Sequence, residues 1–359
     1  MKNNLFSVRN LILLGIFILV AVVSTFFLIG NSEQNQDRPS LKPDHELSYY
    51  GSIGIGIDKV NYGVESFKKN YQYLDGLNLY WYDLADNGTF VRDSSVSTDV
   101  EKDVIAFAKK NNIKISVGIG DHGEAEKADV ILSDENKQKK HISKIVSLLV
   151  EKGYDGVIID YEDLRNEQEE AFTNYMRKLS LEVHFVGKTL GISAPIETTG
   201  RVFHGINVVA VSEVVDRMHL VSYEEFGSET EPGPIASIDW VNTIIKNIVD
   251  QGVSPSKLVL GTAHSGHDWI ISPSKEFFKD TTTKGVLSIF SEKNATLKWD
   301  EKTQSRFFEY KDDSNSNHIV WLEDSKSFKA KIGLAKSYKI QGIFIWYLGG
   351  EDNEIWEMM

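Results

Sequence analysis

Eight short apolar runs alternate with amphipathic stretches between residues 49 and 348, and this alternation constrains the fold more than any other feature of the chain. The runs are rich in β-branched and aromatic residues, which favour strands, whereas the stretches between them carry apolar residues at helical spacing. The expected strands lie at 49–57, 76–84, 114–120, within 153–164, and at 189–197, 218–225, 257–266 and 342–348. Strands that alternate with helices form parallel sheets, so these eight units predict an α/β chain folded as a (β/α)8 TIM barrel.

Helices are expected between these strands, at 64–73, 98–111, 137–152, 167–187, 238–251 and 328–338. A longer segment, residues 267–327, separates the seventh strand from the eighth. It contains three short runs, at 295–299, 306–311 and 318–322, which have the pattern of antiparallel strands. We therefore expect a small α+β insertion between strands seven and eight.

Residues 11–29 are nineteen uncharged, mostly apolar residues, which is just long enough for a helix that crosses a hydrocarbon core of about 30 Å. The run is longer than the core of a usual signal peptide, and no A-x-A cleavage site follows it, so a transmembrane signal anchor is favoured over secretion after signal cleavage. Lys2 and Arg9 precede the run, which predicts a single-pass protein of the cell membrane with its C-terminal domain outside the cell. The predicted parts are a cytoplasmic N-terminus (1–10), the anchor (11–30), a polar linker (31–48) and the barrel (49–359).

The composition excludes several classes of function. The net charge is −13, whereas a nucleic-acid-binding protein needs a basic face. The chain has no cysteine, which excludes disulfides, thiol catalysis and zinc–thiolate sites, and its nine histidines show no HExxH or paired spacing. We expect no metal, no organic cofactor and a monomer.

The stretch Gly153–Leu164, GYDGVIIDYEDL, contains a short apolar run that ends in carboxylates. Because side chains alternate across a strand, Ile158, Asp160 and Glu162 share one face. Two acids at the carboxyl end of a buried strand are costly unless they serve a function, although a strand that simply runs into a solvated loop would also fit this stretch. Active sites of TIM barrels lie at the carboxyl ends of the strands, which favours the functional interpretation.

Aromatic and acidic residues also follow the other expected strands at the ends where a barrel would place its active site. This combination suits a carbohydrate, whose rings stack on aromatic faces and whose hydroxyl groups bond to carboxylates. The residues concerned are Tyr80, Trp81, Tyr82 and Asp83, then Asp121, His122, Glu197, Tyr223, Glu224, Glu225, His264, Trp346 and Tyr347.

The run from Asp155 to Glu162 resembles the signature Asp-Gly-x-Asp-x-Asp-x-Glu of glycoside hydrolase family 18, on the fourth barrel strand. Ser116-Val117-Gly118 resembles the Ser-x-Gly-Gly motif of that family, and Ser222-Tyr223-Glu224 resembles its Met-x-Tyr-Asp motif. The C-terminal GIFIWYLGGEDNEIW is similar to the strand with the family's tryptophan, and its Gly-Gly-Glu-Asp tail resembles the bacterial cell-wall and spore-peptidoglycan branch. The resemblance covers residues 49–356 in order.

The resemblance implies a retaining mechanism in which the 2-acetamido oxygen of the substrate is the nucleophile. It implies that Glu162 is the acid/base, that Asp160 orients the acetamido group, that Tyr223 bonds its carbonyl oxygen and that Trp346 is the floor under the sugar. The other residues that we expect to bind substrate are Trp81, Tyr82, Glu224, Ser116 and Gly118. Asp155 and Gly156 are expected to be structural parts of the motif.

One position departs from the signature, because Ile158 stands where the family has its middle aspartate. The resemblance thus predicts a chitinase-like glycosidase that cleaves β-1,4 bonds next to N-acetylated amino sugars, in peptidoglycan or a chitin-like polymer. The alternative is an envelope protein that binds the amino-sugar polymer with weak or no catalysis. Retention of Glu162 favours the enzyme, and Ile158 favours the binding protein.

Overall fold

The computed structural model describes residues 47–359 apart from 203, 229 and 273. The predicted membrane segment and nearly all of the predicted linker lie outside these residues. None of the helices within the described part is long and apolar enough to cross a membrane. Residues Leu47–Met359 form one compact unit.

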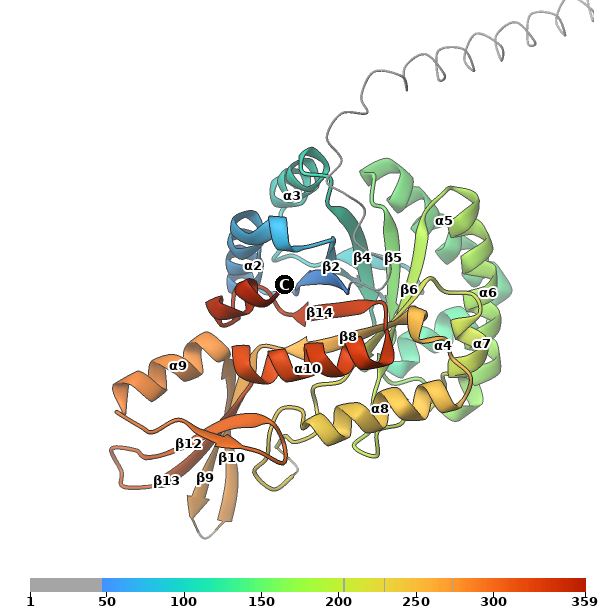
Figure 1. Cartoon of the computed structure of the whole chain (residues 1–359). Coiled ribbons are helices and arrows are strands. Elements are labelled where there is room, and N and C mark those ends of the chain that lie inside the picture. The colour runs from blue at the N-terminus through green and yellow to red at the C-terminus, as the bar shows by residue number, and fades with distance from the viewer. Residues whose placement is uncertain (1–46, 203, 229, 273) are drawn as a thin grey trace, which may run out of the picture. The chain divides into compact units, whose positions relative to one another are not determined.

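Eight parallel strands close into a barrel (Figure 1). The first strand pairs with both the second and the last, which closes the sheet and confirms the predicted barrel. In the order of their hydrogen-bonded neighbours the strands are β1 (Ser48–Ile53), β14 (Gly342–Trp346), β8 (Leu258–Ala263), β7 (Arg217–Val221), β6 (Thr189–Pro195), β5 (Gly156–Asp160), β4 (Lys114–Gly120) and β2 (Gly76–Leu84). A short antiparallel strand, β3 (Phe90–Arg92), is added to β2.

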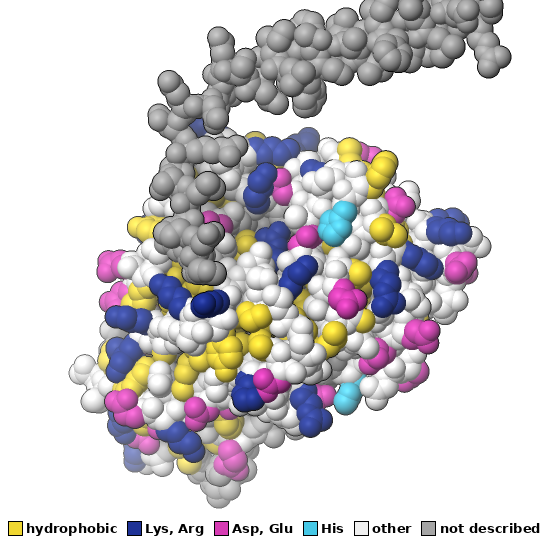
Figure 2. All heavy atoms as spheres, turned by 45° about the vertical axis from the view of Figure 1, so that its right-hand side comes forward, with side chains coloured by type: hydrophobic (Ala, Val, Ile, Leu, Met, Phe, Trp, Pro, Cys, Tyr) yellow, Lys and Arg dark blue, Asp and Glu magenta, His cyan; other side chains and the backbone are white. Residues whose placement is uncertain are grey.

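Helices surround the strands, and the main hydrophobic core lies between the two layers. The helices are α2 (Ile57–Asn70), α3 (Thr98–Lys110), α4 (Ala125–Leu132), α5 (Glu135–Lys152), α6 (Glu169–Phe185), α7 (Val208–Ser212), α8 (Ile238–Asp250) and α10 (Ser325–Tyr338). Short 3-10 turns lie at Tyr71–Tyr73, Asn166–Gln168, Pro255–Lys257 and Asn353–Met358. Acidic and basic side chains are interspersed on the face shown in Figure 2, so that the described residues present no continuous basic field there.

The chain between β8 and β14 forms a small α+β insertion beside the barrel, at the lower left of Figure 1. Its antiparallel sheet has the order β10-β9-β13-β12-β11. The strands are β9 (Ser265–Ser272), β10 (Ser274–Thr282), β11 (Lys298–Asp300), β12 (Ser305–Lys311) and β13 (Asn317–Leu322), with helix α9 (Thr283–Glu292) after β10. Val286 of α9 packs on Phe308, Val320 and Leu322, which gives the insertion its own small core.

Several predicted boundaries were wrong, and the structure gives a local reason for three of them. The first strand ends at Ile53, not at residue 57, because the chain turns at Gly56, which has φ 99°, and helix α2 starts directly after it. The sixth strand ends at Val221, since the Ser222 hydroxyl donates to the carbonyl of Gly261 and the chain then leaves the sheet. Residues 265 and 266 belong to β9 of the insertion and do not extend the seventh strand.

The two faces of β5 have different surroundings. Val157 and Ile159 point outward into the core between strands and helices, whereas Ile158 is absent from that core although it is 1% exposed. The interior of the barrel has its own apolar cluster, made of Tyr50, Tyr223, Ile235, Val259, Ala263 and Phe344. This alternation places Ile158 inside the barrel and Asp160 at its mouth.

Candidate active site

Asp160 and Glu162 lie at the carboxyl end of β5, in the mouth of the barrel. Asp160 is in register with Gly120 of β4, and a Cβ at Gly120 would lie 3.4 Å from Oδ2 of Asp160. The glycine therefore leaves room for the carboxylate to lie across the end of β4. Glu162 follows two residues later, where its side chain keeps contact with solvent.

Asp121, which directly follows β4, fixes the backbone under the second acid. Its Oδ1 accepts hydrogen bonds from the backbone N–H groups of Glu162, at 3.0 Å, and of Gly123, at 3.2 Å. Its side chain is fully buried, and burial raises its pKa. The sequence did not identify this role, because nothing in a loop aspartate indicates which amide it will accept. The structure makes Asp121 a support for Glu162.

The acids in the mouth raise one another's pKa. Burial, followed by the charges of Asp121 and Glu224, raises the pKa of Asp160, and a hydrogen bond from Ser193 opposes that rise. Burial and then the charge of Asp160 raise the pKa of Glu162. A glutamate that holds its proton near neutral pH can act as a general acid, and its contact with solvent lets it exchange that proton with water.

Three aromatic side chains, Tyr80, Tyr223 and Trp346, lie near the acids. Trp346, at the end of β14, meets Tyr80 of β2 edge to face, with 5.2 Å between ring centroids. Tyr223, which follows β7, meets Phe344 in the same way at 6.1 Å. Burial raises the pKa of Tyr223 far above its usual value, so its hydroxyl remains a hydrogen-bond donor. The structure thus gathers Asp160, Glu162, Tyr223 and Trp346 at one end of the barrel.

Gly118 contributes space for Tyr80, which was expected near the end of its strand but without a role in the site. A Cβ at Gly118 would lie 2.6 Å from Cδ1 of Tyr80, so the ring occupies the place that any side chain would take. Burial raises the pKa of Tyr80, and the nearby hydroxyl of Ser193 on β6 opposes that rise. The inward positions on β2 and β6, read with period two, are the signal by which both residues could have been found.

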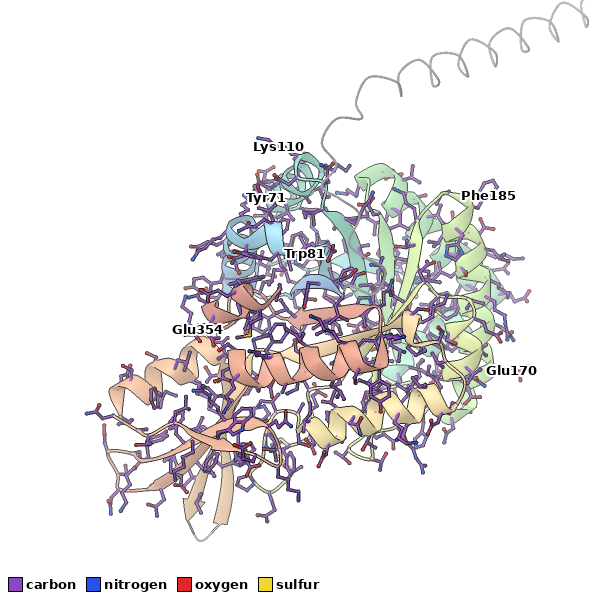
Figure 3. The ribbon with its side chains drawn as sticks, in the orientation of Figure 1. Tyr71, Trp81, Lys110, Glu170, Phe185 and Glu354 are labelled. Atoms are coloured by element: carbon purple, nitrogen blue, oxygen red, sulfur yellow. The ribbon has the colours of Figure 1, made fainter. Side chains whose placement is uncertain are left out.

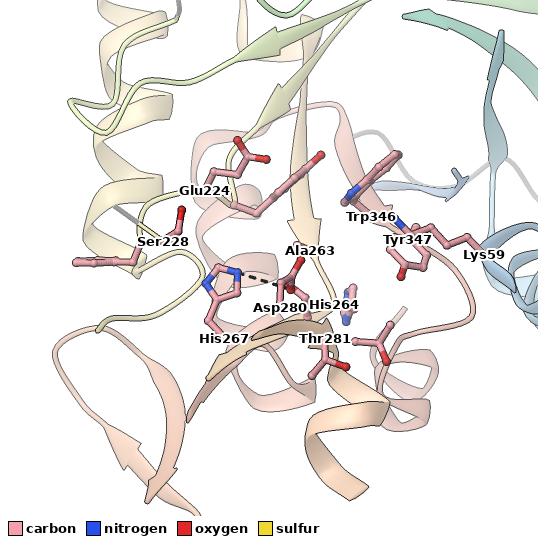
Figure 4. Close-up of a pocket in the computed structure, with 15 residues that line it drawn as sticks. Lys59, Glu224, Ser228, Ala263, His264, His267, Asp280, Thr281, Trp346 and Tyr347 are labelled. Atoms are coloured by element: carbon pink, nitrogen blue, oxygen red, sulfur yellow. Dashed lines mark ion pairs between the residues drawn. The ribbon is translucent and has the colours of Figure 1, made fainter. Parts of the chain in front are cut away.

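A cavity of about 520 Å³ adjoins the mouth, between the barrel and the insertion (Figure 4). Figure 4 shows Trp346 and Tyr347 on one side of it, and Glu224, Ser228 and His267 on the other. Burial and the charge of Asp280 raise the pKa of Glu224. Asp160 and Glu162 do not line this cavity, so it extends the site away from the acids and toward β10.

Three residues predicted to bind substrate lie elsewhere. Trp81 is the extra residue of a bulge in β2, is fully buried and packs in the core between strands and helices (Figure 3). Tyr82 lies in the same core, where its hydroxyl donates to Glu101 at 2.7 Å. Ser116 is buried deep in the barrel, in register with Asn78 and Gly156. None of the three reaches the mouth.

Asp155 and Gly156 hold the base of β5. The carboxylate of Asp155 accepts from the backbone N–H of Ile115, at 3.0 Å, and from Lys114, at 3.1 Å. A Cβ at Gly156 would lie 2.2 Å from Oγ1 of Thr189, so only glycine fits between β4 and β6. Among the residues that the structure describes, no group of three or more potential ligands is placed to hold a metal ion.

Comparison with known proteins agrees with this geometry. The sequence model of "Glycosyl hydrolases family 18" matches residues 48–351. The chain is 24% identical over 305 residues to the uncharacterized glycosylase YvbX of Bacillus subtilis, which covers 80% of this chain and 86% of that protein. It is 26% identical over 240 residues to the cortical fragment-lytic enzyme of the same organism, which covers 64% of this chain but 54% of that enzyme.

Solved structures share the fold. The spore cortex-lytic enzyme SleL of Bacillus cereus has a TM-score of 0.78 and 20% identity, over 87% of this chain and 73% of SleL. A chitinase of Chromobacterium violaceum also has a TM-score of 0.78, with 19% identity, over 87% of this chain and 97% of that enzyme.

Proposed function

The chain belongs to glycoside hydrolase family 18, and from this premise we propose that it cleaves β-1,4 bonds next to N-acetylated amino sugars, in peptidoglycan or a chitin-like polymer. The observation that carries the proposal is the pair of acids at the end of β5, whose pKa values are both raised, near Tyr223 and near the pair of rings Tyr80 and Trp346. The names of the relatives, a cortical fragment-lytic enzyme and a chitinase, support the same class of substrate.

Glu162 is the general acid in the proposed reaction. It donates its proton to the glycosidic oxygen as the bond from that oxygen to the anomeric carbon breaks. The carbonyl oxygen of the substrate's own 2-acetamido group bonds to the anomeric carbon from the opposite face, which gives a cyclic oxazolinium ion. Glu162, now ionised, then takes a proton from water as that water attacks the anomeric carbon. The acetamido group is restored, and the sugar keeps its configuration.

Asp160 and Tyr223 act on the acetamido group. The carboxylate of Asp160 accepts the N–H of the acetamide and stabilises the positive charge of the oxazolinium ion, and the hydroxyl of Tyr223 donates to its oxygen. Trp346 supplies a flat apolar surface under the sugar ring. The cavity beyond Trp346, with Glu224 and Asp280 in its wall, accommodates the next part of the chain of sugars.

Hydrolysis by the full-length protein tests the proposal. N-acetylglucosamine oligomers and purified peptidoglycan are incubated with the protein, and the reducing ends released are identified by mass spectrometry. We expect products with an N-acetylated sugar at the new reducing end and with retained configuration in an early NMR spectrum. Absence of product from every polymer, with retained binding of the oligomers, would refute the enzyme and leave the second candidate, a binding protein.

The binding protein is favoured by one observation, the apolar Ile158 beneath Asp160. If the protein only binds the polymer, oligomers should bind with the same affinity to the wild-type protein and to Glu162→Gln, and neither protein should hydrolyse them. Isothermal titration of both proteins, together with the product analysis above, separates the two candidates.

We also propose that residues 11–29 anchor the protein in the cell membrane with the barrel outside. The length of the apolar run and the preceding Lys2 and Arg9 support this. Fractionation of cells tests it, because an anchored chain keeps its full mass in the membrane fraction. A shortened chain in the medium would show secretion after signal cleavage instead.

A further inference from the structure

Ile158 fills the barrel directly below Asp160. It is in register with Gly118 of β4 on one side and with Gly191 of β6 on the other. Tyr80 covers Gly118, and a Cβ at Gly191 would lie 3.2 Å from Cγ1 of Ile158. The isoleucine is therefore tightly held, and it offers Asp160 neither a charge nor a hydrogen bond.

The support for Asp160 comes from the neighbouring strand instead. Ile158 pairs with Gly191, so the next inward positions, Asp160 on β5 and Ser193 on β6, lie at the same level. Ser193 is 2% exposed, and as a polar neighbour its hydroxyl lowers the pKa of both Asp160 and Tyr80. An ionised carboxylate can only accept, so in a hydrogen bond between the two the Ser193 hydroxyl donates and Asp160 accepts.

We propose that Ser193 is a positioning residue that replaces the missing carboxylate at position 158, because from the neighbouring strand it donates to Asp160 and holds it in one orientation at the mouth. The inference rests on the proposed function, since it concerns the group that orients the acetamide. In this arrangement Asp160 has a single fixed donor on the side of the barrel interior. Catalysis then does not depend on a second aspartate.

The charge on Asp160 also depends on the groups that face it from other elements. These are Asp121 and His122 after β4, Glu162 after β5, Tyr80 on β2, and Tyr223 and Glu224 after β7. Most of them are acids or neutral phenols, so the Ser193 hydroxyl and His122 are the groups that favour the ionised form. Loss of the serine hydroxyl should therefore raise the pKa of Asp160.

The variant Ser193→Ala tests the proposal in the full-length protein. A hydrogen bond to a charged group is worth enough for a fall in kcat of roughly 10- to 100-fold, with a smaller change in KM. The acidic limb of the pH profile should move to higher pH by roughly one unit, because Asp160 must be ionised. The matched control is Ser52→Ala, which removes another fully buried serine hydroxyl inside the barrel that has no partner among the described residues. This control should keep both kcat and the acidic limb.

Rescue gives a second test. Asparagine at position 158 can donate its amide N–H to Asp160 without adding a charge, so Ser193→Ala combined with Ile158→Asn should recover part of the lost kcat. If the double variant with Ile158→Asn folds poorly, Ile158→Asp combined with Ser193→Ala replaces it in the rescue experiment. The proposal is overturned if Ser193→Ala keeps its acidic limb and loses no more kcat than Ser52→Ala.

A readout without turnover separates this inference from the proposed function. Carbon-13 labelled aspartate allows the carboxyl of Asp160 to be titrated by NMR, with Asp160→Asn to assign its signal. The midpoint should rise in Ser193→Ala and stay in Ser52→Ala, whether or not the protein hydrolyses any polymer. An inactive wild type that shows this shift would refute the proposed function alone, whereas an unchanged midpoint would refute the role of Ser193.

Discussion

Two glutamates of this barrel, Glu101 and Glu162, have opposite surroundings. Glu101 of α3 is fully buried, yet it accepts four short contacts, from the hydroxyls of Tyr82 and Tyr154 and from Arg92 and Lys152, each at 2.7 Å. Burial opposes its charge, but the bonds from Lys152, Tyr154 and Tyr82 outweigh burial and lower its pKa.

Glu162 is more exposed, and its pKa moves the other way. Burial and the carboxylates of Asp160 and Asp121 raise it, and no side-chain donor is among its causes. The comparison shows that depth alone does not set the direction in which the pKa of an acid moves in this fold. The hydrogen-bond donors around the carboxylate decide its protonation state. A carboxylate with several donors stays ionised, whereas one among like charges keeps a proton that it can give away.

The strongest test of this contrast is Glu162→Gln. Loss of the general acid should lower kcat by roughly 10²- to 10⁴-fold, while binding of oligomers is retained. Activity is measured on N-acetylglucosamine oligomers and affinity by titration calorimetry. The matched control is Asp163→Asn, which removes the next, exposed acid and should change kcat little. Equal losses of kcat in the two variants would show that a lack of hydrogen-bond donors around a carboxylate does not identify the general acid.

Glu101→Gln should have the next largest effect, on stability and not on chemistry. The amide puts its own N–H groups against donors that then lack an acceptor, so we expect a loss of about 2–3 kcal/mol in the free energy of unfolding. The figure is reduced because Arg92 and Lys152 are partly in contact with water. Denaturant unfolding measures it, with Glu65→Gln on the exposed face of α2 as the control, expected to change stability by less than about 0.5 kcal/mol. If Glu101→Gln has the same free energy of unfolding as the wild type, the four donors do not stabilise the ionised form of Glu101.

The sequence predicted the position of Glu162 better than it predicted the surroundings of Glu101. Period-two alternation alone puts Asp160 and Glu162 on the inward face of β5, and the eight repeats put that end of the strand at the mouth. Glu101 could not be found in this way, because its four donors come from β2, β3, the end of α5 and the turn before β5, which only the closed barrel brings together.

The run Tyr80-Trp81-Tyr82 shows why Trp81 and Tyr82 were wrongly expected to face the substrate. A simple alternation would put Tyr80 and Tyr82 on one face, but the bulge shifts the register between them, so that Tyr82 packs outward with Trp81. Nothing in three consecutive aromatic residues reveals a bulge. The sequence likewise does not reveal that β9 pairs with β10 on one side and with the distant β13 on the other.

The pH dependence of stability should differ in sign between the two acids. The raised pKa of Glu162 favours folding below the unfolded pKa of glutamate, and that contribution is lost as the pH rises through the folded pKa. The lowered pKa of Glu101 gives stability above the unfolded pKa, which is lost as the pH falls through the folded value. Glu162→Gln should therefore stabilise the protein at neutral pH by roughly 1 kcal/mol, a small value because the side chain is solvated, and not at all in acid. Unfolding in urea at both pH values measures this, and a gain of the same size in acid would contradict it.

The smallest expected effect comes from Asp121→Asn, which changes the charge beside Glu162 but keeps the oxygen that accepts its backbone N–H. Removal of one like charge should lower the pKa of Glu162, so the alkaline limb of kcat, where the general acid loses its proton, should move to lower pH by a few tenths of a unit. The acidic limb should also move down, because Asp121 raises the pKa of Asp160 as well. A profile that shifts as a whole would therefore show that the acids titrate as one group of like charges. If the alkaline limb stays fixed while kcat falls, Asp121 acts through the backbone of Glu162 alone, and its charge has no part in keeping the proton on the acid.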